Sequence, residues 1–216
     1  MQLEKMSDFF TKRIDKYENN MLSNVEGCKE GYIKLSELIP ISCKKILDLG
    51  CGTGLELKEI FNKNPNLEVT GIDLTQAMLY KLKINFPDKN IKLICANYFD
   101  VPFGEKVFDY VISFQTMHHF SKESKVNLYK KIHKALKPNG AYIECDYVAK
   151  NQEEENHFFS ELNRIRNEEN IGTNEIVHFD TPCTIENQII MFKSAGFKES
   201  TKVWQKAQMA IILNKI

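Results

Sequence analysis

The feature that most constrains this chain is a short apolar run that breaks into three glycines at alternate positions. Residues 45–54 read KILDLGCGTG, in which aliphatic side chains flank one acid, Asp48, before Gly50, Gly52 and Gly54. The LELKEIF stretch that follows places apolar side chains at helical spacing. Glycine suits positive φ or a ligand that presses against the main chain, and a helix start offers unpaired N–H groups. The pattern therefore predicts a buried strand, a glycine turn and a helix start.

Two classes of cofactor are held by such a turn, and the glycine spacing distinguishes them. The dinucleotide fingerprint needs glycines at its first, third and sixth positions. Counted from Gly50 the sixth position is Leu55, and counted from Gly52 it is Leu57, so neither register fits. This disfavours a nicotinamide or flavin cofactor. The Asp-x-Gly-x-Gly-x-Gly pattern of residues 48–54 instead resembles motif I of class I S-adenosylmethionine-dependent methyltransferases.

Length and composition are those of an ordinary soluble domain. The chain has 216 residues, of which 43% are hydrophobic and 27% charged, which suits one α/β domain with a small cap. Its 29 basic and 29 acidic side chains balance, which argues against a large basic surface for nucleic acid. No apolar run approaches the roughly 18 residues of a membrane span, and the N-terminus has no signal-peptide core. We expect a cytoplasmic monomer or homodimer without nucleic-acid or membrane partners.

The cysteines show no pattern of a disulfide framework or a metal site. No two of them form a CxxC pair, and no histidine lies at a zinc-site spacing from them. The six cysteines are Cys28, Cys43, Cys51, Cys95, Cys145 and Cys183. We expect free thiols in a reducing compartment and no bound metal.

Strands and helices alternate along the chain, which predicts right-handed βαβ units and a parallel sheet. Helical spacing occurs within 1–39, 121–136, 151–170 and 184–195, and strand patterns within 67–72, 91–96, 108–113, 140–147, 197–203 and 208–214. Thr75 and Thr184 are expected to cap helices. The fold class is α/β: a Rossmann-like, seven-stranded, mostly parallel sheet with an antiparallel C-terminal strand and helices on both faces.

We expect a single methyltransferase domain over residues 1–216. Its parts are an N-terminal helical lid (1–40), a cofactor-binding core (41–148), a helical insertion or cap (149–183), and a C-terminal helix with a β-hairpin (184–216). The resemblance to class I methyltransferases is strong over residues 41–147 and weaker in the hairpin. A helical lid over the cofactor is common in that family.

The resemblance implies S-adenosyl-L-methionine as cofactor and S-adenosyl-L-homocysteine as product. Asp73 would bind both ribose hydroxyls, because a carboxylate offers two acceptor oxygens. Asn97 stands where the family most often has Asp, so the detail of its contact with adenine stays open. The residues implied in cofactor binding are Asp48, Gly50, Cys51, Gly52, Gly54, Asp73, Leu74, Met78, Asn97, Tyr98, Phe114 and Gln115.

The implied reaction is in-line displacement, in which an O, N, S or C nucleophile of a small molecule attacks the sulfonium methyl. The protein mainly supplies proximity and exclusion of water, and a base is needed only if the nucleophile must lose a proton. His118 of the His118-His119-Phe120 stretch could be that base or an orienting donor, whereas His119 is expected to pack. Polar aromatics suit small amphipathic substrates, and the candidates for substrate binding are Tyr17, His118, Tyr147, His178 and Trp204.

Two other enzyme classes stay open as alternatives. An RNA or protein methyltransferase often carries an Asn-Pro-Pro-Tyr-like tetrapeptide after the fourth strand, where this chain reads SFQT at 113–116. An enzyme that modifies S-adenosylmethionine itself would need an arginine cluster near the methyl group. The expected walls contain no arginine, and Arg164 and Arg166 lie on the insertion. A small-molecule methyltransferase is therefore favoured.

Overall fold

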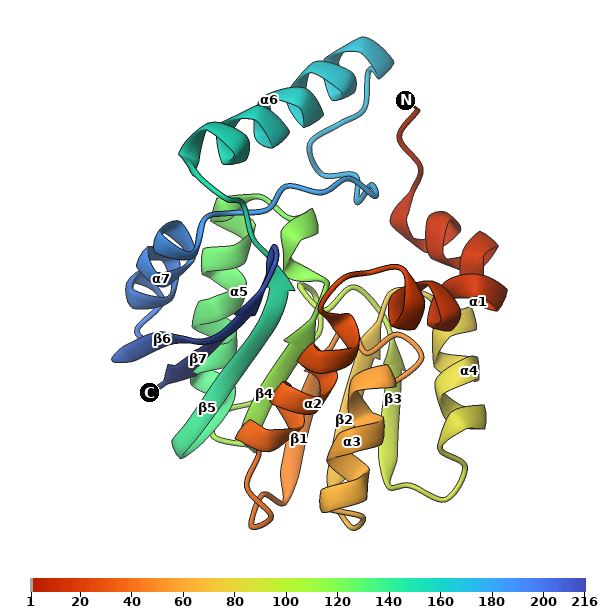
Figure 1. Ribbon diagram of the computed structural model, residues 1–216, viewed down its shortest axis with the longest axis vertical. Helices are drawn as coiled ribbons and strands as arrows, with labels where there is room; N and C mark the ends of the chain where they lie inside the picture. The colour runs from red at the N-terminus through yellow and green to blue at the C-terminus, as the bar shows by residue number, and fades with distance from the viewer. Residues whose placement is uncertain (1) are drawn as a thin grey trace.

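The computed structural model describes residues 2–216, so Met1, which the expected lid included, lies outside the described residues. Seven strands form one sheet in the order β3-β2-β1-β4-β5-β7-β6 (Figure 1). The strands are β1 Lys45–Leu49, β2 Glu68–Asp73, β3 Ile91–Cys95, β4 Phe108–Phe114, β5 Leu136–Tyr147, β6 Glu199–Lys206 and β7 Met209–Lys215. The helices are α1 Met6–Ser23, α2 Cys28–Leu38, α3 Leu55–Lys63, α4 Gln76–Asn85, the 3₁₀-helix η1 Met117–His119, α5 Lys122–Ala135, α6 Gln152–Glu169 and α7 Ile185–Ser194.

The sheet is the predicted Rossmann-like sheet with one antiparallel strand. β3, β2, β1, β4 and β5 pair in parallel, and β7 pairs antiparallel with both β5 and β6. Leu49, the last residue of β1, lies opposite Ile72 of β2 and Ser113 of β4. The strand order reverses between β1 and β4, and ligands in such sheets bind at the carboxyl ends beside that reversal. The glycine turn lies at this position.

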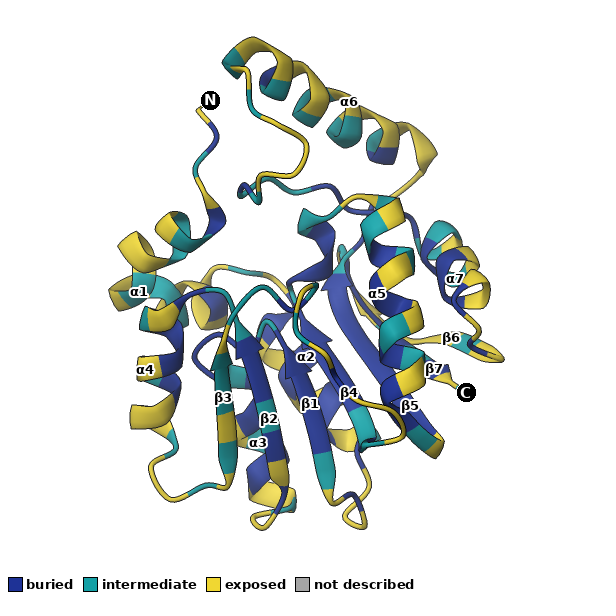
Figure 2. Cartoon of the chain, turned by 180° about the vertical axis from the view of Figure 1, so that it is seen from behind, coloured by how far each residue is buried: buried dark blue, intermediate teal, exposed yellow. Residues whose placement is uncertain are grey.

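Helices cover both faces of the sheet, and each face has its own hydrophobic core. On one face Leu35 of α2, Ile60 of α3 and Leu82 of α4 pack together. On the other face Tyr129 of α5 packs against Phe192 of α7. The central strands between these layers are almost entirely buried (Figure 2). This burial explains why they read as apolar runs in the sequence.

The N-terminal segment and the insertion form one lid above the carboxyl ends of the strands (Figure 1). Lys5 and Val177 form an antiparallel bridge, and the Glu4 carbonyl accepts the N–H of His178 at 2.9 Å. Leu3 packs with Ile165 and Val177 in a small separate core. The two segments expected to cover the site therefore hold each other in place.

Two local expectations differ from the structure, and one cap is confirmed. β5 starts at Leu136 rather than at 140, because Leu136 already pairs with Phe108 before a register shift. Thr75 precedes α4, but its side chain accepts no hydrogen bond from the helix. The Oγ1 of Thr184 does accept the N–H of Asn187, at 3.2 Å, as predicted.

Candidate active site

The three glycines of the turn after β1 have positive φ, but they serve different purposes. A Cβ on Gly50 would lie 2.6 Å from Oγ1 of Thr116, and one on Gly54 would lie 2.9 Å from Cε2 of Phe86. These two glycines allow close packing. A Cβ on Gly52, where φ is +46°, would meet nothing nearer than 3.6 Å. Gly52 is thus the position where the turn leaves space for a ligand.

Asp73, the last residue of β2, fastens this turn to the neighbouring strand. Its Oδ2 accepts the N–H of Gly52 at 2.9 Å, and its Oδ1 accepts the N–H of Thr75 at 2.7 Å. Burial raises the pKa of the Asp73 carboxyl, although the backbone N–H donors oppose the shift. Each carboxylate oxygen keeps a second lone pair, so the group can still accept from a ligand.

A narrow cavity of about 50 Å³ lies against the turn. Its walls include most of the residues predicted to bind the cofactor: Gly50, Gly52, Asp73, Leu74, Met78, Asn97, Tyr98, Phe114 and Gln115. Asp48, Cys51 and Gly54 do not line it. Within the described residues 2–216, the structure therefore gathers one part of the predicted set around a cavity and leaves these three behind the turn.

Asp48 lies in the protein interior beside Glu56 of α3. Burial raises the pKa of Asp48 well above its usual range, and the negative charge of Glu56 adds to the shift. Burial also raises the pKa of Glu56, to about 7. Two carboxyls that share a buried space cannot both ionise at low energetic cost. Burial therefore favours the protonated forms of both carboxyls, behind the glycine turn.

Asn97 and Tyr98, after β3, are engaged mainly by neighbouring residues. The Asn97 Oδ1 accepts the N–H of Phe99 at 3.1 Å, and its Nδ2 donates to Asp100 at 2.9 Å. The Tyr98 hydroxyl lies 3.0 Å from Oγ1 of Thr116. The adenine contact expected of Asn97 stays a prediction, and one hydrogen of its amide is left to make it.

Gln115, directly after β4, is held in an unusual conformation. Its φ is +51°, which a non-glycine residue rarely adopts. Its backbone N–H is fixed by the carbonyl of Cys145 at 2.8 Å. Its side-chain Nε2 is buried and has no hydrogen-bond partner among the described residues. A strained residue with an unpaired buried amide is typical of a ligand-binding position.

A second cavity of about 760 Å³ adjoins the first. Four residues line both cavities: Phe10, Tyr17, Gln115 and His119. The predicted substrate-binding residues Tyr17, His118, Tyr147 and His178 line the larger one. Trp204 does not, because it lies on the edge strand β6, opposite Ile211 of β7, and packs against the hydrophobic core that contains Ile211. The structure does not bring Trp204 to the site.

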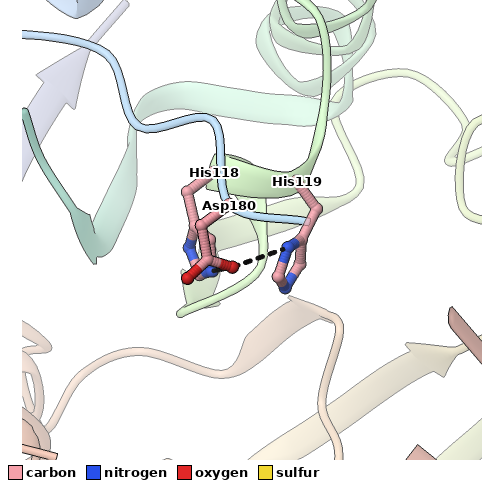
Figure 3. Close-up of side chains that lie close together, drawn as sticks. All are labelled: His118, His119 and Asp180. Carbon is pink, nitrogen blue, oxygen red and sulfur yellow. Dashed lines mark ion pairs between the residues drawn. The ribbon is translucent and has the colours of Figure 1, made fainter. Parts of the chain in front are cut away.

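His118 is buried and fixed by Asp146 of β5. Asp146 accepts the backbone N–H of His118 at 2.9 Å, and its Oδ1 lies 2.5 Å from Nδ1 of the ring. The opposite ring atom, Nε2, lies 3.5 Å from Oδ1 of Asp180 (Figure 3). Burial lowers the pKa of His118, but the two carboxylates outweigh this effect and raise it above the usual value. Asp146 thus engages Nδ1 and orients the ring, which leaves Nε2 as the ring nitrogen that can interact with a ligand.

His119 is the neutral member of the histidine pair. Burial lowers its pKa well below the usual value, and the neighbouring His118 and His178 lower it further. Its Nδ1 lies 3.2 Å from the carbonyl oxygen of Phe179 and 3.4 Å from Oδ1 of Asp180. The His119 side chain is almost fully buried and lines both cavities.

The comparisons with known proteins agree with this geometry. Residues 46–140 match the family model described as a methyltransferase domain. Over this stretch, slightly under half of its length, the chain is similar to the class I S-adenosylmethionine-dependent methyltransferases. The methyltransferase fold is also shared with human N-acetylserotonin methyltransferase in complex with S-adenosylmethionine, at a TM-score of 0.69 and 17% identity, over 98% of this chain and 59% of that one.

Two relatives by sequence have different activities. A malonyl-[acyl-carrier protein] O-methyltransferase of Legionella pneumophila is 29% identical over 64% of this chain and 48% of its own length. A carboxy-S-adenosyl-L-methionine synthase of Nautilia profundicola is 25% identical over 74% of this chain and 72% of its own. The chain spans about half the length, or less, of most curated relatives that it matches.

The larger cavity also has walls that the sequence did not predict, among them Phe10, Arg13, Lys16 and Asp180. The expectation that the walls contain no arginine is wrong, because α1 carries Arg13 into them. Its guanidinium donates to Glu4 at 2.9 Å and lies over the ring of Phe9. A helical pattern on α1 shows which residues share a face, but not which part of the protein that face covers.

Among residues 2–216, no helix combines the length and apolarity that a membrane span requires.

Proposed function

We propose that this protein transfers the methyl group of S-adenosylmethionine to a small-molecule acceptor by direct in-line displacement. The observation that carries the proposal is the junction of the two cavities at Phe10, Tyr17, Gln115 and His119. A cofactor against the glycine turn and an acceptor in the larger cavity would meet there. Fixing two reactants in line is the main catalytic contribution such a reaction needs.

The residues around the narrow cavity suit S-adenosylmethionine. Beside Gly52 the turn is covered only by the Tyr17 side chain of α1, and Asp73 keeps lone pairs for two ribose hydroxyls. The buried Nε2 of Gln115 has no hydrogen-bond partner among the described residues. It would donate to a polar group of the methionine end of the cofactor or of the acceptor. When bound, the cofactor supplies an electrophilic methyl on a sulfonium. Asp48, Cys51 and Gly54 would support the turn without contacting the cofactor.

The narrow cavity is too small for the whole cofactor in this conformation. Its volume is about 50 Å³, whereas pockets for ligands of this size measure roughly 300–1,000 Å³. Tyr17 of α1 lies across the turn, with its hydroxyl 3.6 Å from the Cβ position of Gly52. We infer that α1 moves away from the turn to admit the cofactor and then covers it. Water is thereby excluded from the reacting methyl.

His118 is placed to meet the nucleophile of the acceptor. Because Asp146 engages Nδ1, the opposite Nε2 faces Asp180 and the larger cavity. In a metal-free site, Nε2 would take the proton of a hydroxyl, thiol or amine. Tyr147 and His178 would shape the acceptor space, and the ring of His178 is itself held by stacking on Phe9 at 3.4 Å.

A small acceptor fits the enclosure better than a macromolecule. The larger cavity has the volume of an ordinary small-ligand pocket, and α1 and the insertion cover it (Figure 1). The balanced charge of the chain supports no nucleic-acid partner. The buried free thiols support a reducing, cytoplasmic location.

An enzyme that modifies S-adenosylmethionine itself is the second candidate. The presence of Arg13 and Lys16 in the wall of the larger cavity favours it, because cations there could hold an added carboxylate. The similarity to the Nautilia synthase is consistent with this candidate. The pairing of Arg13 with Glu4 weakens it, since the guanidinium is already partly neutralised.

A screen of small metabolites with mass-spectrometric detection tests both candidates. Release of S-adenosylhomocysteine together with an acceptor heavier by one methyl supports the proposed transfer. A heavier form of the cofactor itself, without a methylated acceptor, supports the second candidate. Methylation of RNA or protein under the same conditions, with no small molecule accepted, overturns the choice of a small acceptor.

A further inference from the structure

We propose that His118, His119 and Asp180 form a binding site for a divalent transition-metal ion, Zn²⁺ in the first instance, in the wall of the larger cavity. One ligand atom from each residue lies within 4.8 Å of the other two. Figure 3 shows the three side chains turned toward one common space. The histidines come from η1 after β4, and Asp180 from the loop after the insertion.

Two of the three separations already match those of a metal site. Nε2 of His118 lies 3.5 Å from Oδ1 of Asp180, and Nδ1 of His119 lies 3.4 Å from the same oxygen. A tetrahedral zinc site with bonds of about 2.0–2.1 Å places neighbouring ligand atoms about 3.3–3.4 Å apart. The third separation, between the two histidine nitrogens, is within 4.8 Å, so the rings must turn toward each other to bind one ion.

The first histidine is oriented as metal-binding histidines are. The Asp146 carboxylate lies 2.5 Å from Nδ1 of His118, so that nitrogen is engaged and Nε2 is left as the ligand atom. A carboxylate behind the imidazole is the usual support of a zinc-bound histidine. The carbonyl of His118 also accepts the N–H of Thr181 at 2.6 Å, which fixes η1 against the loop that carries Asp180.

The other two ligands are also held by the backbone. On the N-terminal side of Asp180, the N–H of His178 is bonded to Glu4, and on the C-terminal side Thr181 is bonded to His118. His119 must change its hydrogen bonding to take part. Its Nδ1 lies 3.2 Å from the Phe179 carbonyl and donates to it without the ion. Metal binding through Nδ1 breaks this hydrogen bond and places the ring hydrogen on Nε2.

The type of donor selects the class of metal. Two imidazoles and one carboxylate suit Zn²⁺ or Fe²⁺, whereas Mg²⁺ and Ca²⁺ prefer oxygen ligands throughout. Three protein ligands leave an open position, and all three residues line the larger cavity. The Asp180 side chain lines the larger cavity and is 43% exposed. The open coordination position would therefore be accessible from the acceptor space.

The role of the ion rests on the proposed methyl transfer, whereas its binding does not. An oxygen or sulfur of the acceptor at the open position would lose its proton more readily, because the positive charge stabilises the anion. This favours an alcohol, phenol or thiol as acceptor. In that state Nε2 of His118 is a ligand and not the base.

Calorimetric titration of Zn²⁺ into the untagged, chelator-treated full chain tests the site. We expect one ion per chain. We expect Asp180→Asn and His118→Ala each to weaken binding by at least about 100-fold, and Asp146→Asn by about 10–100-fold. His157→Ala, an exposed histidine on α6, is the matched control and should bind as the wild type does.

Co²⁺ provides an independent readout of the ligand set. The wild type should show visible absorption bands of tetrahedral or five-coordinate Co²⁺, and Asp180→Asn should lose them. Asp180 is partly exposed, so this variant is expected to fold even where His118→Ala does not. Equal Zn²⁺ affinity in the wild type and in Asp180→Asn overturns the site. Binding of S-adenosylmethionine is measured separately in the same samples. Failure of the metal site therefore does not decide whether the protein transfers a methyl group.

Discussion

The Oδ2 atom of Asp73 lies 2.9 Å from the backbone nitrogen of Gly52, so the end of β2 holds the glycine turn that follows β1. The contact joins two residues that are 21 positions apart in the sequence. It fixes a carboxylate beside the one glycine of the turn where a Cβ would meet no atom nearer than 3.6 Å. The cofactor proposal depends on this pair.

Substitution of Gly52 by alanine should weaken binding of S-adenosylmethionine. A Cβ there would occupy the open side of the turn, and a non-glycine residue at positive φ costs about 1–2 kcal/mol of stability. We expect lower affinity by calorimetry and a lower urea midpoint. Gly172→Ala is the control, because its Cβ would meet nothing within 4 Å. Wild-type affinity in Gly52→Ala would place the cofactor elsewhere.

Substitution of His118 by alanine should lower turnover far more than it lowers cofactor affinity. His118 faces the acceptor cavity and does not line the narrow one. A lost proton acceptor reduces rates by about 10²–10⁴-fold, and the loss of a metal ligand should also reduce turnover. The rate of S-adenosylhomocysteine release and the dissociation constant of S-adenosylmethionine measure the two effects. An unchanged rate would show that His118 has no catalytic role and only packs in the site.

The stability of the protein should fall as pH rises from about 4.5 to about 7. Burial raises the pKa of Glu56 from 4.5 in the unfolded chain to about 7 in the folded protein. Between these values the folded state binds more protons than the unfolded state, so raising pH favours unfolding. Urea midpoints at pH 5 and pH 8 measure the fall.

The Glu56→Gln variant isolates the contribution of this carboxyl. It should lose less stability than the wild type between pH 5 and pH 8, whereas exposed Glu105→Gln should behave as the wild type does. A wild-type midpoint that rises over this range would show that the buried carboxyls do not control the pH dependence.

Local patterns predicted the central fold because the strands are buried on both faces. Uninterrupted apolar runs indicate such strands, and the glycine spacing separates two cofactor classes. The bonds of Thr184 to its helix are equally local, and so this cap was predicted correctly. Thr75 was not, because the N–H of Met78 bonds to the backbone carbonyl of Thr75 at 3.1 Å and none bonds to its side chain. A residue type favoured at helix starts does not show which of its oxygens will accept the hydrogen bond.

The walls of the larger cavity were only partly predicted, since they are assembled by contacts between distant segments. Arg13 reaches the cavity because α1 lies against α4, and Asp180 reaches it because Thr181 bonds to His118. Trp204 was expected there from its place near a hairpin turn, but the order of β7 and β6 in the sheet puts it at the edge. The spacing of apolar residues along the chain predicts neither the order of the strands at the edge of the sheet nor the position of a lid.

The affinity of the protein for S-adenosylmethionine, compared between the wild type and Asp73→Ala, shows whether the glycine turn and Asp73 hold this cofactor. We expect the wild type to bind the cofactor and the variant to lose about 10–100-fold in affinity, the effect of removing hydrogen bonds to a charged group. Exposed Asp88→Ala is the control, and circular dichroism checks that each variant is folded. Equal affinity in folded Asp73→Ala and wild type would show that Asp73 does not bind the ribose.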